Sequence, residues 1–401
     1  MNMIKLGVIA DDFTGASDAA SFLVKAGNRT VLLTEVPSSF SFACDCIVIG
    51  LKIRSVESHE AIEQVGKAVD FFEQLGIEQY YYKYCSTFDS TPKGNIGPVM
   101  DYLLERTNSK YSILCPSLPV NGRTVDNGHL YVNGVPLDKS PLKDHPLNPM
   151  WDSYIPNLMK EQSKYNAYPI DLNNGIPSID EEHYYLVPNY VTENDGKQIA
   201  KQFKNLKVLS GGSGLLEFLV GNNNIDVKEN STNINGQKAI IMCGSCSEMT
   251  HNQVEYFKDK GNKYISVNAN DLNSGKIDAH NVFERVVNNL PNVTLIYSDG
   301  CEGNLATDSN ILKKNSKIME KFFSDLALLA KENGFDKVVV AGGETSGSVA
   351  MSLGYASFCV GKSVAPGVPW LYPLDNPNMC ILLKSGNFGD EKFFEKALEV
   401  S

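Results

Sequence analysis

The stretch Gly7–Gly27, GVIADDFTGASDAASFLVKAG, contains the pattern that decides the fold of this chain. An apolar run over Ile4–Ala10 predicts a buried strand, and small and apolar residues then recur at helical spacing. The helical positions are Ala16, Ala19, Ala20 and Leu23. Asp11 and Asp12 therefore lie where a strand ends and a helix begins, which in an open α/β sheet is the edge that binds ligands. An aspartate before a helix is also an ordinary N-cap, so a capping role and a catalytic role both remain open.

Apolar strands alternate with helical stretches along both halves of the chain. In the first half, strands are predicted at 29–36, 44–53, 79–87 and 110–118, with a helix over 58–75. In the second half, strands are predicted at 238–243, 263–267, 293–298, 337–341 and 380–384. Between the halves, the stretch NNNIDVKENSTNING at 222–236 is too polar to pack a core.

The alternation predicts an α/β protein of two domains, 1–225 and 237–401, joined by a linker over 226–236. Each domain is expected to be a largely parallel sheet flanked by helices. The active site is expected in the interdomain cleft.

The composition is that of a globular protein. The chain has 401 residues, of which 42% are hydrophobic and 21% charged, and its formal net charge is -11. No long basic run offsets this charge, so neither nucleic acid nor an anionic membrane is an expected partner. The N-terminus lacks the basic start and uninterrupted apolar core of a signal peptide, and no apolar stretch is long enough to span a bilayer. A soluble, cytoplasmic protein is therefore expected.

The cysteines and histidines do not suggest a metal or disulfide framework. Nine cysteines is an odd number for disulfides, and several lie in apolar, strand-like runs. These are Cys46, Cys115, Cys359 and Cys380. Cys243 and Cys246 form a single C-x-x-C pair, which is weak support for zinc and leaves a redox motif as the minor alternative. The six histidines show no metal-binding spacing.

Three strand ends in the second half carry small polar residues that suit a phosphate group. In VVVAGGETSGSVAMSLG, a strand ending at Ala341 runs into Gly342 and Gly343 and then into a helix. Glycines let the backbone approach a phosphate closely, and a helix N-terminus supplies N–H donors. The other two strand ends carry Gly244, Ser245 and Ser247, and Ser385, Gly386 and Gly389. Together they predict one nucleotide site, although a tight strand-to-helix turn would also explain the first stretch.

Two familiar nucleotide motifs are not supported. The stretch GYASFCVGKS ends like a Walker A motif at 361–363, but Ala356 stands where the first glycine of that motif belongs. The stretch VLSGGSGLLEFL offers Gly211, Gly212 and Gly214 after a strand. The acidic residue of a dinucleotide site would then fall within the polar linker, so a dehydrogenase is the weaker alternative.

The first half supplies cations that an anionic substrate needs, on the predicted edge that carries the paired aspartates. The cations that follow or end strands are Lys52, Arg54, Lys83 and Arg123, and they are accompanied by Ser86, Thr87 and His129. This set fits a small polyhydroxylated carboxylate, with cations for its anionic group and carboxylates for its hydroxyls. A lone lysine or arginine is as often a solvated surface group. His129 could equally be a core histidine on a hairpin that turns at Asn133 and Gly134.

Longer motifs run from Ala10 to beyond Gly389. They read ADDFTGASDAA, KYCSTFDSTPKGNIGP, CPSLPVNGRTVDNGHLYVNGVPL, HPLNPM, SGGSGL, CGSCS, AGGETSG, PGVPW and LKSGNFG. In these motifs the chain resembles the four-carbon acid sugar kinase family. The resemblance implies a sugar-acid domain followed by a nucleotide domain, and transfer of phosphate from ATP to the terminal hydroxyl of a tetronate or its oxidised form. The motifs look most similar to the branch that forms 3-oxo-tetronate 4-phosphate, with D-threonate and D-erythronate kinases as the alternative.

The resemblance also implies roles for individual residues. The implied ATP contacts are Ser245, Ser247, Gly342, Gly343, Glu344, Thr345, Ser346 and Gly386. The implied sugar-acid contacts are Asp11, Asp12, Arg54, Lys83 and Arg123, to which the residue pattern adds Ser86 and His129.

Phosphoryl transfer needs a base near the acceptor hydroxyl, cations around the γ-phosphate and Mg²⁺. Asp12 is the expected catalytic base, with Asp11 binding hydroxyls. Mg²⁺ is expected from the chemistry, with Glu344 as a candidate ligand and the other ligands unknown. The two domains are expected to close over both substrates and exclude water. A non-catalytic sensor of sugar acid and nucleotide is the alternative from another class, and a homo-oligomer would leave no signature in one sequence.

Overall fold

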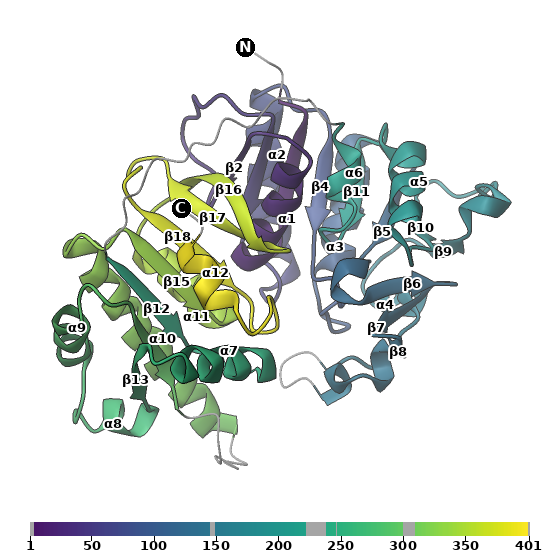
Figure 1. The fold of residues 1–401 in the computed structure, drawn as a ribbon. Helices are drawn as coiled ribbons and strands as arrows, with labels where there is room; N and C mark the ends of the chain where they lie inside the picture. The colour runs from purple at the N-terminus through teal and green to yellow at the C-terminus, as the bar shows by residue number, and fades with distance from the viewer. Residues whose placement is uncertain (1–3, 145–148, 222–237, 246, 300–308, 400–401) are drawn as a thin grey trace. The chain divides into compact units, whose positions relative to one another are not determined.

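The computed structural model describes residues 4–144, 149–221, 238–245, 247–299 and 309–399 (Figure 1). The chain divides into two compact units, residues 1–227 and 228–401. Each unit is built on a largely parallel sheet flanked by helices, so the predicted fold class is confirmed. The predicted linker at 226–236 lies outside the described residues. The location of the active site in an interdomain cleft stays a prediction.

The sheet of the first unit is parallel. Its strand order is β2 (Thr30–Leu33), β3 (Cys46–Gly50), β1 (Leu6–Ala10), β4 (Tyr80–Lys83), β11 (Val208–Gly211), β5 (Tyr111–Cys115), β10 (Tyr184–Pro188) and β9 (Ala167–Ile170). The central strands are fully buried, which explains their unbroken apolar sequences.

Helices cover both faces of this sheet. They are α1 (Phe13–Lys25), α2 (Ser58–Gln74), α3 (Ile96–Thr107), α4 (Ile155–Lys160), α5 (Glu193–Phe203) and α6 (Leu216–Leu219). Gly7 on β1 faces α2, since a Cβ there would lie 2.5 Å from the Phe72 ring. Gly50 on β3 faces α1, since its Cβ would lie 3.0 Å from that of Ala16. Gly50 pairs with Ala10 of β1, so these two residues face the same side of the sheet. Ala10 is three positions from Gly7, and side chains alternate between the two faces along a strand, so Gly7 faces the other side. Helices α1 and α2 therefore lie on opposite faces of the sheet.

A small antiparallel sheet, β6 (Arg123–Asp126), β7 (His129–Val132) and β8 (Val135–Pro136), follows β5. Short 3₁₀ helices flank this region: η1 (Pro119–Asn121), η2 (Leu137–Lys139), η3 (Pro141–Asp144) and η4 (Leu172–Asn174). Asn133 and Gly134 connect β7 to β8 with φ of 50° and 78°. Positive φ at both positions is typical of a tight hairpin turn, so the predicted hairpin is confirmed.

The second unit has the strand order β13 (Lys263–Val267), β14 (Thr294–Ser298), β12 (Ala239–Cys243), β15 (Lys337–Ala341), β18 (Cys380–Lys384), β17 (Val368–Pro373) and β16 (Ser357–Ala365). The first five run parallel, whereas β17 is antiparallel to both β18 and β16. Residues 361–363, which resemble the end of a Walker A motif, lie inside β16 and not in a strand-to-helix loop.

The helices of the second unit are α7 (Glu248–Asp259), α8 (Ala269–Asn273), α9 (Ala279–Asn288), α10 (Ser309–Glu332), α11 (Gly343–Ser352) and α12 (Phe393–Glu399). Alternate residues of the strands, such as Ile241 and Leu382, pack against Phe257 of α7 and Phe394 of α12. Helices α8, α9 and α11 pack instead against α10. Within the described residues, no helix combines the length and the apolarity needed to cross a membrane.

The observed strands of the first unit are shorter than the predicted ones. The predicted strand 44–53 becomes β3, Cys46–Gly50, because the chain leaves the sheet while it stays buried. Leu51 is 6% exposed and Ile53 0%. The Leu51 N–H donates to the carbonyl of Ala10, the last residue of β1, and the Ile53 N–H donates to the carbonyl of Asp11. Apolar composition therefore marks burial here, beyond the end of the strand.

Candidate active site

Asp11, Arg54 and Lys83 meet at one edge of the first sheet. Strands β3, β1 and β4 are parallel neighbours, so the segments that follow them leave the sheet at its carboxyl edge. The Asp11 N–H donates to the Lys83 carbonyl at 3.0 Å, and the Asp11 carbonyl accepts from the Ile53 N–H at 3.1 Å. Residues from three separate motifs are thereby brought side by side.

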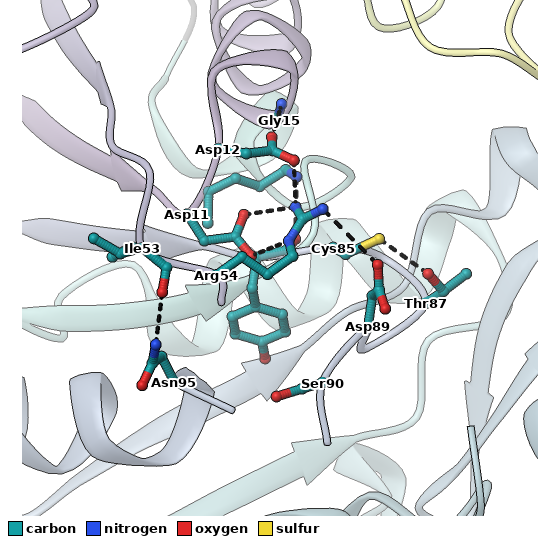
Figure 2. Close-up of polar contacts among 12 residues, drawn as sticks. Asp11, Asp12, Gly15, Ile53, Arg54, Cys85, Thr87, Asp89, Ser90 and Asn95 are labelled. Atoms are coloured by element: carbon teal, nitrogen blue, oxygen red, sulfur yellow. Dashed lines mark hydrogen bonds and ion pairs between the residues drawn. The ribbon is translucent and has the colours of Figure 1, made fainter. Parts of the chain in front are cut away.

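The Arg54 guanidinium binds both paired carboxylates (Figure 2). Its Nε and Nη2 donate to the two oxygens of Asp11 at 2.8 and 2.9 Å. Its Nη2 also lies 2.7 Å from Oδ2 of Asp12, and its Nη1 lies 3.9 Å from Oδ2 of Asp89. A two-point pair of this kind fixes the orientation of both groups. Arg54 therefore organises the carboxylates of this edge.

Asp12 caps the helix that follows it. Its backbone is extended, with φ -147° and ψ 166°, and its side chain accepts a hydrogen bond from the Gly15 N–H at the start of α1. This confirms the capping role that the sequence left open. The cap uses Oδ1 and the ion pair with Arg54 uses Oδ2. The carboxylate is therefore held at both oxygens, and a catalytic role stays a prediction.

Burial and charge set the two aspartates apart. Burial raises the pKa of Asp11 above its ordinary value, and the Arg54 guanidinium only partly offsets it. Burial acts in the same direction on Asp12, but Arg54, the Gly15 N–H and Lys83 outweigh it and the pKa of Asp12 is lowered. The Asp12 side chain is 34% exposed and that of Asp11 3%. Asp12 is thus the ionised carboxylate that a ligand can reach.

Lys83 is buried against a carboxylate that the sequence reasoning missed. Its Nζ lies 3.6 Å from Oδ2 of Asp18 on α1 and donates to the Tyr84 carbonyl at 3.0 Å. Burial raises the pKa of Asp18 although Lys83 acts against it. The sequence did contain an indication of this pair, because Asp18 lies among alanines on the apolar face of α1, where an acid needs a partner.

The carboxylates of this cluster outnumber its cations. Asp11, Asp12 and Asp89 surround Arg54, and Asp18 faces Lys83. A cluster with this charge balance suits hydroxyl donors better than an anion.

Arg123 differs from the other predicted cations. It begins β6, and its Nη1 donates to the Asn121 carbonyl. Its Nε is buried and has no hydrogen-bond partner among the described residues. Burial lowers the pKa of Arg123, and the Cys85 thiol interacts electrostatically with both Arg123 and Arg54. Arg123 is therefore a partly buried cation close to the cluster, whereas Lys52 is exposed.

Ser86, Thr87 and His129 have different surroundings. Ser86 follows β4 and lies beside Gly212, whose Cβ would be 3.4 Å from that of Ser86. The Thr87 hydroxyl lies 2.9 Å from the Cys85 sulfur. Nδ1 of His129 lies 3.1 Å from the Ser153 hydroxyl, and the centroid of its ring lies 4.8 Å from that of the Tyr154 ring, with the two rings tilted by 39°. These contacts join His129 of β7 to the segment directly before α4, and its role in substrate binding stays a prediction.

The three predicted nucleotide segments meet in the second unit. Their strands, β12, β15 and β18, are parallel neighbours. The Gly342 N–H donates to the Lys384 carbonyl at 2.8 Å. A Cβ on Gly386 would lie 2.7 Å from Oγ of Ser245 and 2.9 Å from Oγ of Ser247, so only glycine lets these segments approach so closely.

The start of α11 offers backbone donors. Gly342 has φ 127° and makes no side-chain cap, and a Cβ on Gly343 would meet no atom of the described residues within 4 Å. The first N–H groups of a helix lack partners within it and favour an anion. A phosphate cradle at these residues stays a prediction.

Several predicted hydroxyl and acid groups serve the fold. The Ser247 side chain caps α7 by accepting from the Thr250 N–H. The Ser346 hydroxyl lies 3.4 Å from the Lys384 carbonyl, below the cradle. Thr345 is 5% exposed, and Glu344 accepts from the Ser316 hydroxyl at 2.9 Å. These side chains are engaged within the fold, so the backbone N–H groups at the start of α11 are better placed than they are to contact a phosphate.

The alternative chemistries receive little support. A Cβ on Gly211 would lie 2.0 Å from the Cys115 carbonyl, and one on Gly212 2.5 Å from the Pro116 carbonyl, so these glycines allow β11 to pack against the segment after β5. Burial raises the pKa of Cys243 to about 12, which disfavours a reactive thiolate, and Cys246 lies outside the described residues. Among the described residues, no group of three or more His, Cys, Asp or Glu side chains could hold a metal ion.

Comparison with protein families matches both units. A sugar-binding N-terminal domain matches residues 6–219, and a nucleotide-binding C-terminal domain matches residues 240–394. A protein from Haemophilus influenzae named 3-oxo-tetronate kinase is 39% identical over 98% of each chain. One of the same name from Salmonella typhimurium is 37% identical over 98% of this chain and 99% of its own.

Solved structures share the whole architecture. A crystal structure from Salmonella typhimurium LT2, which carries the name tRNA synthase, has a TM-score of 0.86 and 36% identity over 99% of both chains. One from Haemophilus influenzae has a TM-score of 0.77 and 36% identity over 98% of this chain and 99% of its own. The fold of each unit is therefore shared with these proteins.

Proposed function

Because this chain belongs to the four-carbon acid sugar kinase family, we propose that it transfers the γ-phosphate of ATP to the C4 hydroxyl of a 3-oxo-tetronate. The products are 3-oxo-tetronate 4-phosphate and ADP. The relatives named 3-oxo-tetronate kinase, which align over nearly their full lengths, support this choice of substrate.

The observation that carries the proposal is the ionised, accessible Asp12 carboxylate held by Arg54 in the unit that matches a sugar-binding domain. The proposed step begins with the C4 hydroxyl near Asp12. As its oxygen bonds to the γ-phosphorus, its proton passes to Asp12 and the bond from phosphorus to the ADP oxygen breaks. A base of low pKa is sufficient because the transition state of phosphoryl transfer is loose and the nucleophile loses its proton late.

We assign the substrate carboxylate to Arg123. Arg54 is bound by two aspartates and Lys83 faces a third, so both have less charge to offer an anion. Arg123 has no ion pair among the described residues, and its Nε is unpartnered there. An arginine in this state gains most from a two-point bond to a carboxylate.

The phosphates of ATP are proposed to lie against the start of α11 and the segments after β12 and β18. Gly342, Gly343 and Gly386 supply close backbone approach there. Ser245 adds a hydroxyl, and Ser247 helps to hold it in place.

Mg²⁺ is part of the proposed reaction, and Glu344 stays the candidate protein ligand. Among the described residues, no group of three or more His, Cys, Asp or Glu side chains could hold a metal ion by itself. Mg²⁺ in kinases is usually held by one or two carboxylates together with phosphate oxygens and water. Bound to ATP, it would neutralise charge that develops on the phosphate oxygens. A cytoplasmic location, small-molecule partners without nucleic acid, and closure of the units over both substrates belong to the same proposal.

The test is an ADP-release assay with Mg-ATP and a panel of acceptors: 3-oxo-tetronates of both configurations, D-threonate, L-threonate and D-erythronate. Turnover on a 3-oxo acid far above the reduced acids is the expected result. Best turnover on D-threonate or D-erythronate would retain the kinase and replace the substrate. ATP binding without turnover on any acid would favour the sensor.

A further inference from the structure

Lys384, the last residue of β18, is a buried lysine to which the proposed reaction assigns no role. Lys384 is 0% exposed, and no carboxylate pairs with it among the described residues. Its Nζ donates to Oγ1 of Thr250 at 2.9 Å and to the carbonyls of Ser385 at 3.2 Å and Gly386 at 2.8 Å. A buried charge is costly, and these three acceptors take up the donors of the ammonium group.

These bonds determine which way two peptide groups face. In a trans peptide the C=O and the following N–H point in opposite directions. The Ser385 and Gly386 carbonyls turn toward Lys384, so the N–H groups of Gly386 and Asn387 turn away from it. Neither N–H has an acceptor among the described residues, and Asn387 is exposed.

The same lysine begins a chain of hydroxyl groups. Oγ1 of Thr250 accepts from Lys384 and donates to the Gly386 carbonyl at 2.7 Å. The Ser247 hydroxyl lies 3.0 Å from that of Thr250 and 3.2 Å from that of Ser245. Lys384 thus fixes the segment after β18 against the segment after β12.

We propose that Lys384 is a positioning residue of the nucleotide site, whose ammonium group holds the Gly386 and Asn387 N–H groups toward the phosphates of ATP. The role rests on the proposed function, since it presumes that ATP binds at these segments. The charge also lies beneath the phosphates without a carboxylate to cancel it, in surroundings of low dielectric where its attraction is strong.

The ionisation of Lys384 supports a measurable consequence. Burial lowers the pKa of Lys384 to about 8, and the neighbouring Cys243 thiol only partly counteracts this. The charged groups of the elements around it point elsewhere or are paired: Glu248 and His251 are exposed on α7, Glu344 bonds Ser316 on α10, and Asp390 pairs with Lys396 on α12. The positive charge is therefore lost as the pH rises through about 8.

The experiment is calorimetric titration of the full chain with Mg-ATP between about pH 7 and 9.5. The dissociation constant of the wild type should rise across this range, and binding above pH 8 should take up a proton, seen as a dependence on buffer ionisation heat. Lys384→Met should bind about tenfold more weakly at pH 7 and show no rise with pH. Lys337→Met is the matched control, because Lys337 is also buried but lies at the opposite end of the same strand pair. It should keep the wild-type affinity and pH profile.

Wild-type affinity in Lys384→Met, or a flat wild-type profile, overturns the inference even if the enzyme phosphorylates a sugar acid. If Lys384→Met does not fold, the wild-type profile still decides, together with Thr250→Val, which should weaken binding by several-fold. If the wild type does not bind ATP at all, the proposed function is wrong, and the inference that rests on it is wrong as well.

Discussion

At the scale of single residues, the site depends on how charge is shared. Arg54 binds Asp11 at two points and Asp12 at one, and this lowers the pKa of Asp12 while burial raises that of Asp11. Two adjacent aspartates, Asp11 and Asp12, thus have pKa values shifted in opposite directions. Each property depends on neighbours that come from other strands.

Asp12→Asn should lower kcat at least about 100-fold, since the amide cannot accept the proton of the acceptor hydroxyl. The helix should survive, because asparagine caps as well as aspartate. Asp278→Asn, at the N-cap of α9, is the control and should keep full kcat. Steady-state kinetics with circular dichroism provides the measurement, and wild-type kcat in a folded Asp12→Asn would refute the assignment.

The pH profile of the wild type offers an independent check on Asp12. Because its pKa lies below the ordinary value of 3.8, the carboxylate stays ionised at all pH values above about 5. Activity as a base is present while the group is ionised and is lost only as the pH falls through its pKa. From about pH 5 to 7, kcat should therefore be flat, and an acid limb near pH 6 would point to a different base.

Arg123→Met should raise KM for the sugar acid by about tenfold or more and leave KM for ATP unchanged. The sharper readout compares the acid with the analogue whose carboxylate is replaced by a hydroxymethyl group. The wild type should prefer the acid strongly, and the variant should lose most of this preference. Arg106→Met is the control, because the ion pairs of Arg106 among the described residues are with the exposed Asp70 and Glu73. An undiminished preference in Arg123→Met would place the carboxylate elsewhere.

At the scale of elements, glycines decide where strand ends can approach a ligand or each other. Gly386 is required for packing against Ser245 and Ser247, whereas Gly343 has open space around it. A substitution at Gly343 is therefore expected to change ligand binding without disturbing the fold.

Gly343→Ala should fold normally and lose at least about tenfold in ATP affinity, because the new methyl group would occupy space proposed for phosphate. The new methyl group of Gly347→Ala, one turn further along α11, also meets no atom of the described residues within 4 Å, and this variant should gain about 1 kcal/mol of stability without loss of affinity. Thermal unfolding and nucleotide titration of both variants give the measurement. Equal affinities in the two variants would contradict a phosphate at the start of α11.

At the scale of the whole molecule, the two units should respond to different ligands. In hydrogen–deuterium exchange, a 3-oxo-tetronate should protect 11–15, 51–57 and 84–93, and ADP should protect 244–250, 342–347 and 385–389. Residues 263–273, at the edge strand β13 and α8, serve as an internal control and should not change. Protection of 11–15 by ADP alone, without protection of 342–347, would contradict the division of roles.

Much of the fold was predictable because it is local. Continuous apolar runs and a period-3.6 pattern place β1, α1 and the strands of the second unit close to their observed bounds. The antiparallel strands β16 and β17 were not predicted, since a short apolar run with prolines does not reveal which neighbour it pairs with. The extra length predicted for 44–53 came from buried residues beyond the strand.

By itself the sequence determined that small polar and acidic residues follow strands, and hence that they gather at sheet edges. Only the tertiary structure decided which of them meet, because the strand order β3, β1, β4 differs from the order along the chain. That order pairs Arg54 with the aspartates, and the folding of α1 over the sheet brings Asp18 to Lys83. The ionisation of Asp12 and Lys384 could not be predicted from the sequence either. Their pKa values depend on burial and on neighbouring groups, and only the folded chain brings these together.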